Sequence, residues 1–257
     1  ESMKLAVTDR IRYGGDPRVK DIPIQGLLSE GYAAQQRSRI DRAKAAHVSG
    51  ETFAEGMPSG SLLAGSPEAF DGGMTTHFAA TDRDGNVVSI TQTLGGGFGS
   101  GLAPDNTGIF LNNMCHWFDL EEGSHNRIGP GKRVDFCVAP TQTFLGDKFY
   151  ASMGTPGSWG ILQTTPQFLM HLLDFGMNPQ EAIEAPRYRY YGGVSVQMEE
   201  RFPVEVRKAL EKKGHEITVV EPWSMSVGGA QGFRLNSASG TLEGGADPRR
   251  DGLAIGW

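Results

Sequence analysis

Two stretches near the middle of the chain alternate apolar and polar residues and predict a β-hairpin. Residues 76–82 (THFAATD) and 86–93 (NVVSITQT) repeat with a period of two, which is typical of half-buried strands. Asp84-Gly85 lies between them and is a strong signal for a tight turn that joins two antiparallel strands. The chain is therefore predicted to change abruptly to strand at Thr75.

The remaining pattern predicts helices on both sides of further strands. Helical segments are expected at residues 3–12, 31–48, 160–176 and 203–214, and after Asn178, which can cap a helix that begins at Pro179. Further strands are expected around residues 107–112, 138–145, 149–153, 216–220, 231–236 and 240–244. Strands, then helices, then strands indicate an α+β fold with sheets packed between helical layers, rather than alternating β-α-β units.

Two segments of the first part of the chain look irregular. Residues 14–28 contain Gly-Asp-Pro and Ile-Pro and are expected to form a loop. Residues 49–74 are rich in Gly, Ser, Pro, Glu and Ala, show almost no periodicity, and are expected to form an exposed linker. The first residues have neither a helix cap nor the apolar core of a signal peptide. We therefore expect the chain to begin within a longer gene product, and its compartment stays open between periplasm and cytoplasm.

Composition excludes several classes of function. The formal net charge of −6 argues against a nucleic-acid or anionic-membrane partner, and no apolar run approaches the ~18 residues of a membrane span. The six histidines are scattered without metal-ligand spacing, and no G-x-S-x-G motif is present. Cys115 and Cys137 lie in apolar contexts and are expected to be buried free thiols. The sequence therefore predicts neither a metal nor a cofactor.

One mechanism needs neither histidine nor metal. A threonine at a free N-terminus supplies its hydroxyl as nucleophile and its α-amine as base. Gly72 and Gly73 place a flexible junction before the strand, where the Thr75 hydroxyl could attack the Met74 carbonyl. An N-to-O acyl shift would give an ester, which water would cleave. On the pattern alone, a plain strand start at Thr75-Thr76 is the favoured interpretation, and the concealed nucleophile is the alternative.

A series of motifs resembles one family along essentially the whole chain. In order, they are SMKLAVTDRIRYGGDP, MTTHFAATDRDGNVVSITQT, GFGSG, TGIFLNN, PGKR, APT, MGTPGS, EAPR and GADPRRDGLAIGW. Together they resemble the γ-glutamyltransferase (γ-glutamyl transpeptidase) family of N-terminal-nucleophile hydrolases, which includes a cephalosporin-acylase-like branch. The resemblance implies a four-layer αββα sandwich. It makes residues 1–74 the end of a large-subunit region plus linker, and residues 75–257 the small, catalytic subunit.

The resemblance also implies catalytic roles for particular residues. Thr75 matches the family nucleophile, released by cleavage of the Met74–Thr75 bond. Thr93 matches the threonine that orients the nucleophile. Gly157 and Ser158 match a Gly-Gly pair whose backbone N–H groups form the oxyanion hole, and Ser158 keeps its amide donor.

The implied substrate pocket departs from the family pattern. The resemblance places Gly95 where the family has an asparagine. It places Met114 and Trp117 where the family has the polar residues that hold the glutamyl α-amine. Phe136 and Cys137 occupy the positions at which the family has paired serines that bind the α-carboxylate. A zwitterionic head would lose its polar partners at a cost of several kcal/mol. The pocket is therefore expected to take a more apolar acyl group than γ-glutamyl.

Several nearby residues keep two interpretations. Asn112 and Asn113 could contact the substrate or could hold strand ends, and Trp159 could shape the pocket or cover it. Asp119 or Asp135 could reach in and compensate for the lost polar groups. The Asp247-Pro248-Arg249-Arg250 motif near the C-terminus is expected to stabilise the fold near the site.

The resulting prediction is a self-processing threonine amidohydrolase or acyltransferase. Its substrate would be a small-molecule amide or a peptide, with water favoured over a dipeptide as acceptor. Its partner would be the large-subunit region of the same precursor, and the resemblance allows a homodimer or a heterotetramer of two processed chains. The alternative is an unprocessed, catalytically silent member of the family with a structural or binding role.

Overall fold

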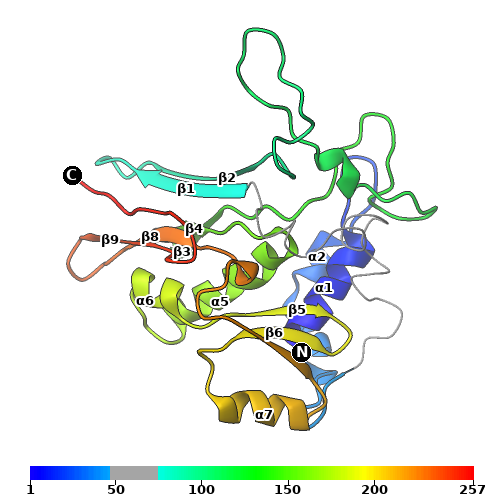
Figure 1. Cartoon of the computed structure of the whole chain (residues 1–257), viewed down its shortest axis with the longest axis vertical. Helices are drawn as coiled ribbons and strands as arrows, with labels where there is room; N and C mark the ends of the chain where they lie inside the picture. The colour runs from blue at the N-terminus through cyan, green and yellow to red at the C-terminus, as the bar shows by residue number, and fades with distance from the viewer. Residues whose placement is uncertain (47–74) are drawn as a thin grey trace.

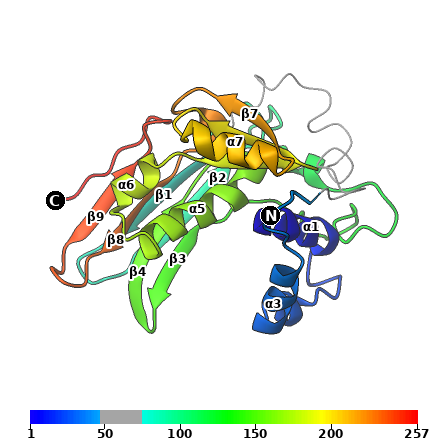
Figure 2. The ribbon, with the colours of Figure 1, turned by 90° about the horizontal axis from the view of Figure 1, so that it is seen from below.

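The computed structural model of the protein describes residues 1–46 and 75–257 (Figures 1 and 2). The predicted linker at 49–74, with Met74, lies outside this range. The helices of the first part are α1 (Ser2–Tyr13), α2 (Ile24–Leu27) and α3 (Glu30–Ser38). None of the helices in the described ranges combines the length and apolar character needed to cross a bilayer.

The predictions for the first part are correct for α1 and wrong in two details. A short helix, α2, forms inside the predicted loop. The helix predicted at 31–48 is α3, which ends at Ser38. The Asp41 carboxylate accepts a hydrogen bond from the Ala43 backbone N–H (2.8 Å) and turns the chain there. This local turn competes with helix continuation, as short acidic side chains commonly do.

The predicted hairpin is confirmed. Strands β1 (Thr75–Thr81) and β2 (Val87–Thr93) pair antiparallel, with Thr75 opposite Thr93. Asp82 closes the connection, because its carboxylate accepts hydrogen bonds from the Asn86 backbone and side chain at 2.9 and 2.7 Å. This register places the first and last residues of the hairpin side by side.

A four-stranded antiparallel sheet lies next to the hairpin. Its order is β3-β4-β8-β9, from strands β3 (Thr141–Leu145), β4 (Lys148–Gly154), β8 (Gln231–Leu235) and β9 (Leu242–Ala246). All four were predicted to within a few residues.

The prediction of a strand at residues 107–112 is wrong. The chain here forms a loop that closes on itself, with Leu111 bonded through its backbone to Ser100 and Leu102. Asn106 and Gly108 adopt left-handed backbone angles (φ 63° and 64°), which break an extended strand.

The third sheet contains strands that the sequence pattern did not predict. Strands β5 (Tyr188–Gly192) and β6 (Ser195–Glu199) form a hairpin, and β6 pairs in parallel with β7 (Glu216–Val220). Helix α7 (Val204–Lys212) connects β6 to β7. The chain therefore does contain one β-α-β unit, contrary to the expectation of none.

The layers stack as the fold class requires. The β1–β2 hairpin packs on one face of the four-stranded sheet, and α5 (Ile161–Leu173) and α6 (Pro179–Glu184) cover the other (Figures 1 and 2). Phe78 and Val88 on the outer face of the hairpin stay nearly half exposed (46% and 43%). The described residues form the β, β and α layers of an αββα sandwich, and the predicted α+β class is confirmed.

The core lies between the central sheet and its two helices. As predicted, Asn178 caps α6: its side chain accepts the Glu181 N–H, and the Glu181 carboxylate accepts the Asn178 N–H. The buried apolar cluster brings together β4, α5, α6 and the start of β8 through Ala151, Met153, Phe168, Leu172, Ala182, Ile183 and Ala230. This packing fixes β4, whose end leads directly into Gly157 and Ser158.

A buried network of charges fastens the C-terminal segment to this core. Asp247 pairs with Arg187 and Arg249, and Arg249 also donates to Glu199 at 2.6 and 2.7 Å. All four side chains are at most 4% exposed. Asp247 accepts the Ala230 N–H as well (2.6 Å), which holds the entry to β8. The predicted stabilising role of the Asp-Pro-Arg-Arg motif is consistent with this arrangement.

Candidate active site

Thr75 lies at the start of β1 with its hydroxyl held in place. The Thr75 hydroxyl donates to the Thr93 Oγ1 (2.9 Å), and the same Thr93 oxygen accepts the Gly95 backbone N–H (2.9 Å). Direct pairing of the two threonines in the ladder brings their side chains to the same face. The two threonine hydroxyl groups are therefore in direct contact.

Any side chain at position 95 would be strained and crowded in this backbone. Its φ is +87°, and a Cβ there would lie 2.1 Å from the Asn113 Oδ1 and 3.0 Å from the Met114 sulfur. Asn113 uses the same Oδ1 to accept the Gly96 N–H (3.0 Å). The structure therefore brings Gly95, Asn113 and Met114 together, and Asn113 holds the backbone of the glycine loop.

The Gly157–Ser158 turn follows the end of β4. Both residues have left-handed backbone angles (φ 130° and 55°), a conformation that costs a non-glycine residue about 1–2 kcal/mol. A Cβ on Gly157 would approach the Gly228 Cα to 3.3 Å, so the turn is packed against the 228–229 loop. The Thr155 hydroxyl accepts the Gly229 N–H (3.0 Å) and fixes that loop in turn. Strained backbone held by surrounding contacts is common at functional sites.

His77 connects the strand of Thr75 to the strand that leads to this turn. It is 1% exposed, its Nδ1 lies 2.8 Å from the Thr91 Oγ1, and its ring occupies the space that a Cβ on Gly154 would need. Burial lowers the pKa of His77 to about 4, so the ring is neutral at neutral pH. A neutral, buried ring thus sets the separation between β1 and the end of β4.

Trp117 and Trp159 stack on each other, and each is adjacent in sequence to a segment of the candidate site. Their ring centroids are 5.9 Å apart and the rings are inclined by 19°. Trp159 follows Ser158 directly, and Trp117 ends the short 3₁₀ turn Met114–Trp117. Trp159 also packs with Val7 of α1, which brings the first helix to the site.

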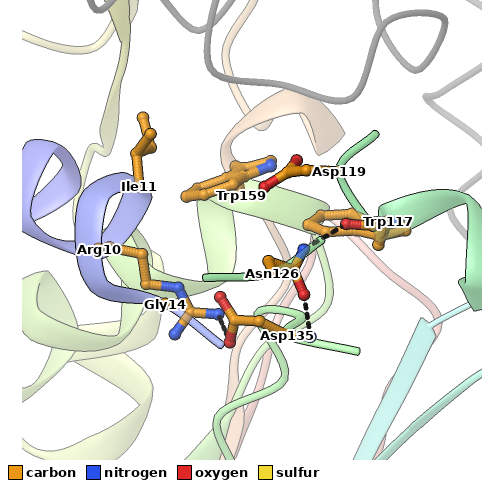
Figure 3. Close-up of a pocket in the computed structure, with 8 residues that line it drawn as sticks. All are labelled: Arg10, Ile11, Gly14, Trp117, Asp119, Asn126, Asp135 and Trp159. Carbon is orange, nitrogen blue, oxygen red and sulfur yellow. Dashed lines mark hydrogen bonds and ion pairs between the residues drawn. The ribbon is translucent and has the colours of Figure 1, made fainter. Parts of the chain in front are cut away.

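The stacked tryptophans border a small cavity (Figure 3). It has room for about one water-sized group, with a volume of ≈ 20 Å³. Figure 3 shows that helix α1 and the segment around 117–135 supply its walls, with charged side chains pointing inward. The cavity is lined by Arg10, Ile11, Gly14, Trp117, Asp119, Asn126, Asp135 and Trp159.

Hydrogen bonds and one ion pair hold this cavity in shape. Arg10 pairs with Asp135 at 2.8 Å. The Asn126 side chain donates to the Trp117 carbonyl oxygen (2.6 Å) and accepts the Asp135 N–H (2.9 Å). Burial raises the pKa of Asp135, while Arg10 lowers it and the negative charge of Asp119 raises it further. The carboxylates are thus close enough to affect each other.

Phe136 and Cys137 differ in exposure, and the cysteine prediction is half right. Cys137 is 3% exposed, and its burial raises the pKa of the thiol to about 12, so the thiol stays protonated. Phe136 is half-buried. Cys115, predicted to be buried, is exposed, because Met114 is the residue that the 3₁₀ turn buries, and both thiols are free.

Arg10 and Asn126 belong to the cavity although no motif indicated them. Arg10 lies three residues after Val7 and next to Ile11, both on the packed face of α1, so helical spacing is the signal that could have drawn attention to it. Asn126 lies in a loop without periodicity. Across residues 1–46 and 75–257, no group of three or more His, Cys, Asp or Glu side chains could hold a metal ion.

Comparison with known proteins identifies the family. The family model described as Gamma-glutamyltranspeptidase matches residues 1–257. The chain belongs to the gamma-glutamyltranspeptidase family. This confirms the resemblance carried by the motifs, and the αββα sandwich of N-terminal-nucleophile hydrolases with it.

Relatives of this gamma-glutamyltranspeptidase family member include both hydrolases and acylases. The Glutathione hydrolase proenzyme of Bacillus subtilis (strain 168) is 32% identical over 260 residues, which is 100% of this chain and 44% of the relative. The Acylase ACY 1 proenzyme of Pseudomonas sp. (strain SE83) is 33% identical over 255 residues, covering 99% and 42%. The solved cephalosporin acylase from Bacillus halodurans superposes with a TM-score of 0.84 at 34% identity, covering 100% and 44%. The chain thus spans less than half the length of these relatives.

Proposed function

We propose that the protein is a self-processing amidohydrolase or acyltransferase whose nucleophile is Thr75. The Met74–Thr75 bond is cut by attack of the Thr75 hydroxyl on the Met74 carbonyl, which divides the precursor into a large-subunit part that ends with residues 1–74 and a small subunit of residues 75–257. The supporting observation is the position of Thr75 as the first residue of β1, with its hydroxyl 2.9 Å from Thr93. Two relatives are named as proenzymes, which supports such processing.

In the processed protein, the new α-amine of Thr75 acts as the base. Its pKa of about 7.7–8.0 lets it accept the hydroxyl proton near neutral pH, whereas the uncut amide nitrogen cannot. The hydroxyl oxygen attacks the substrate's amide carbonyl, and the amine then returns the proton to the leaving nitrogen. Water or an acceptor amine resolves the threonyl ester. The backbone N–H groups of Gly157 and Ser158 stabilise the negative oxygen of each tetrahedral intermediate.

Replacing Thr93 with valine is expected to lower kcat about fivefold, because one neutral hydrogen bond of about 1 kcal/mol no longer orients the nucleophile. KM should change little, since Thr93 touches Thr75 and Gly95 rather than the substrate. Thr93→Ser is the matched control and should keep most of the activity through its hydroxyl. Steady-state kinetics of the processed variants check this, and equal losses in valine and serine variants would contradict the orienting role.

The acyl group is proposed to be more apolar than γ-glutamyl. Met114 is 7% exposed and Cys137 3%, and Trp117 stacks on Trp159 where the family pattern has polar groups. Phe136 and Cys137 offer a carboxylate no side-chain donor stronger than a thiol. A carboxylate on the acyl chain would therefore lose its hydration without full compensation.

Butyryl-p-nitroanilide and glutaryl-p-nitroanilide test this proposal, since they differ only in a terminal carboxylate. With the full-length protein that carries this chain, butyryl is expected to have a kcat/KM about tenfold higher, equivalent to about 1.4 kcal/mol. Efficient use of glutaryl or γ-glutamyl anilides would contradict the apolar pocket. Intact mass spectrometry of the same sample reports whether the chain is cut before TTHF. An uncut chain without turnover would favour a silent member of the family.

A further inference from the structure

The cavity that Trp117 and Trp159 border shares these two residues with segments of the candidate active site. Trp159 directly follows Ser158 of the proposed oxyanion hole. Trp117 ends the turn that begins at Met114, and the Met114 sulfur borders Gly95. Trp117 and Trp159 therefore connect the cavity to segments of the candidate active site.

The charged side chains that line the cavity leave it with one net negative charge. Arg10 and Asp135 neutralise each other in their 2.8 Å ion pair. Asp119 accepts a short hydrogen bond from the Ser124 hydroxyl (2.5 Å), and it makes no ion pair with any described residue. Asp119 is thus the uncompensated carboxylate of the cavity.

The aromatic walls favour the same kind of ligand. Stacked indole rings present faces that attract cations, and the Arg10 guanidinium already lies 6.0 Å from the Trp159 ring centroid. Burial and the neighbouring Asp119 both disfavour the charged form of Asp135, and an added positive charge would relieve this. The volume of ≈ 20 Å³ admits one group the size of water, which is also the size of a primary ammonium.

We propose that this cavity binds the primary ammonium group of an acyl chain that bears no carboxylate beside it. Asp119 supplies the opposite charge, and Trp117 and Trp159 supply the aromatic walls. An adjacent carboxylate is disfavoured because the uncompensated charge of Asp119 would repel it. The inference rests on the proposed acyl transfer and names its substrate class: amides of ω-amino acids, which keep the amine of a γ-glutamyl group and lack its carboxylate.

Two p-nitroanilides isolate the amine. γ-Aminobutyryl-p-nitroanilide and butyryl-p-nitroanilide differ only in the terminal ammonium, and rates are corrected for hydrolysis without enzyme. For the full-length protein, the ratio of their kcat/KM values is expected to favour the amine about tenfold, the size of one charge-assisted interaction. Asp119→Asn should reduce this ratio to about one, whichever way the two absolute rates move. Asp147→Asn, at the exposed turn between β3 and β4, is the matched control and should leave the ratio unchanged.

The two proposals fail in different ways. A wild-type ratio of kcat/KM for the γ-aminobutyryl over the butyryl anilide at or below one overturns the ammonium site, even if the Asp119→Asn protein is unstable. An unchanged ratio in a folded Asp119→Asn protein overturns it as well. Butyryl turnover in that case leaves the proposed acyl transfer standing. Absence of turnover with every anilide, in a chain that has been cut before Thr75, overturns both.

Discussion

A protein with Thr75 replaced by alanine is expected to stay as one unbroken chain and to hydrolyse no anilide. Alanine keeps the strand but lacks the hydroxyl that is proposed to attack first the Met74 carbonyl and then the substrate. Because each step requires this oxygen, the expected loss is at least about a thousandfold in kcat/KM, as for other covalent nucleophiles. Intact mass spectrometry and anilide hydrolysis measure the two effects on one sample.

Thr75→Ser is the control for this prediction. Serine retains the hydroxyl, so cleavage and some turnover should remain, while its hydrogen bond to Thr93 can still form. Cleavage of the alanine variant at the same bond would point to an outside protease and would remove the argument for self-processing. Turnover by an uncut alanine variant would exclude Thr75 as the nucleophile.

Replacing Asp247 with asparagine is expected to lower the free energy of unfolding by about 3 kcal/mol, because a buried ion network loses one partner. Arg187 would then lose its carboxylate partner, and Arg249 would keep only Glu199. Urea denaturation measures the change. The uncut Thr75→Ala background is preferable here, since unfolding then involves one chain.

Asp251→Asn is the matched control for the network. Asp251 is exposed and lies four residues further along the same segment, so its loss should change the free energy of unfolding by less than about 0.5 kcal/mol. A similarly small effect for Asp247→Asn would show that the segment from 247 to 249 contributes little to folding. In that case the motif would need another explanation.

The elements nearest Thr75 are those that the sequence predicts best. Period-two alternation and the Asp-Gly turn act within twenty residues, and they fix the register that pairs Thr75 with Thr93. The aromatic run at 188–191 has no comparable alternation, because β5 lies between other elements and buries both kinds of position. Local patterns therefore predicted the hairpin and missed β5.

The cavity could not be predicted from sequence for a different reason. Its charge depends on contacts between residues more than a hundred positions apart, such as Arg10 and Asp135. The substitution pattern at Trp117 and Phe136 indicates lost polar groups. The sequence names Asp119 and Asp135 as residues that could compensate for them, but it does not show which of the two carboxylates is paired with an arginine. Apolar replacement at single positions therefore does not describe the charge of the cavity that Arg10, Asp119 and Asp135 line.

Helix α1 gives the proposed cut an additional physical consequence. Arg10 and Val7 precede the Met74–Thr75 bond, whereas their partners Asp135 and Trp159 follow it. Once that bond is broken, these contacts join two polypeptides, and their effective concentration is no longer set by a connecting chain. Strong dilution or mild denaturant should then remove Arg10 from a site whose threonine and oxyanion turn stay together. Loss of activity in that form would depend on protein concentration, and recovery on mixing would follow second-order kinetics.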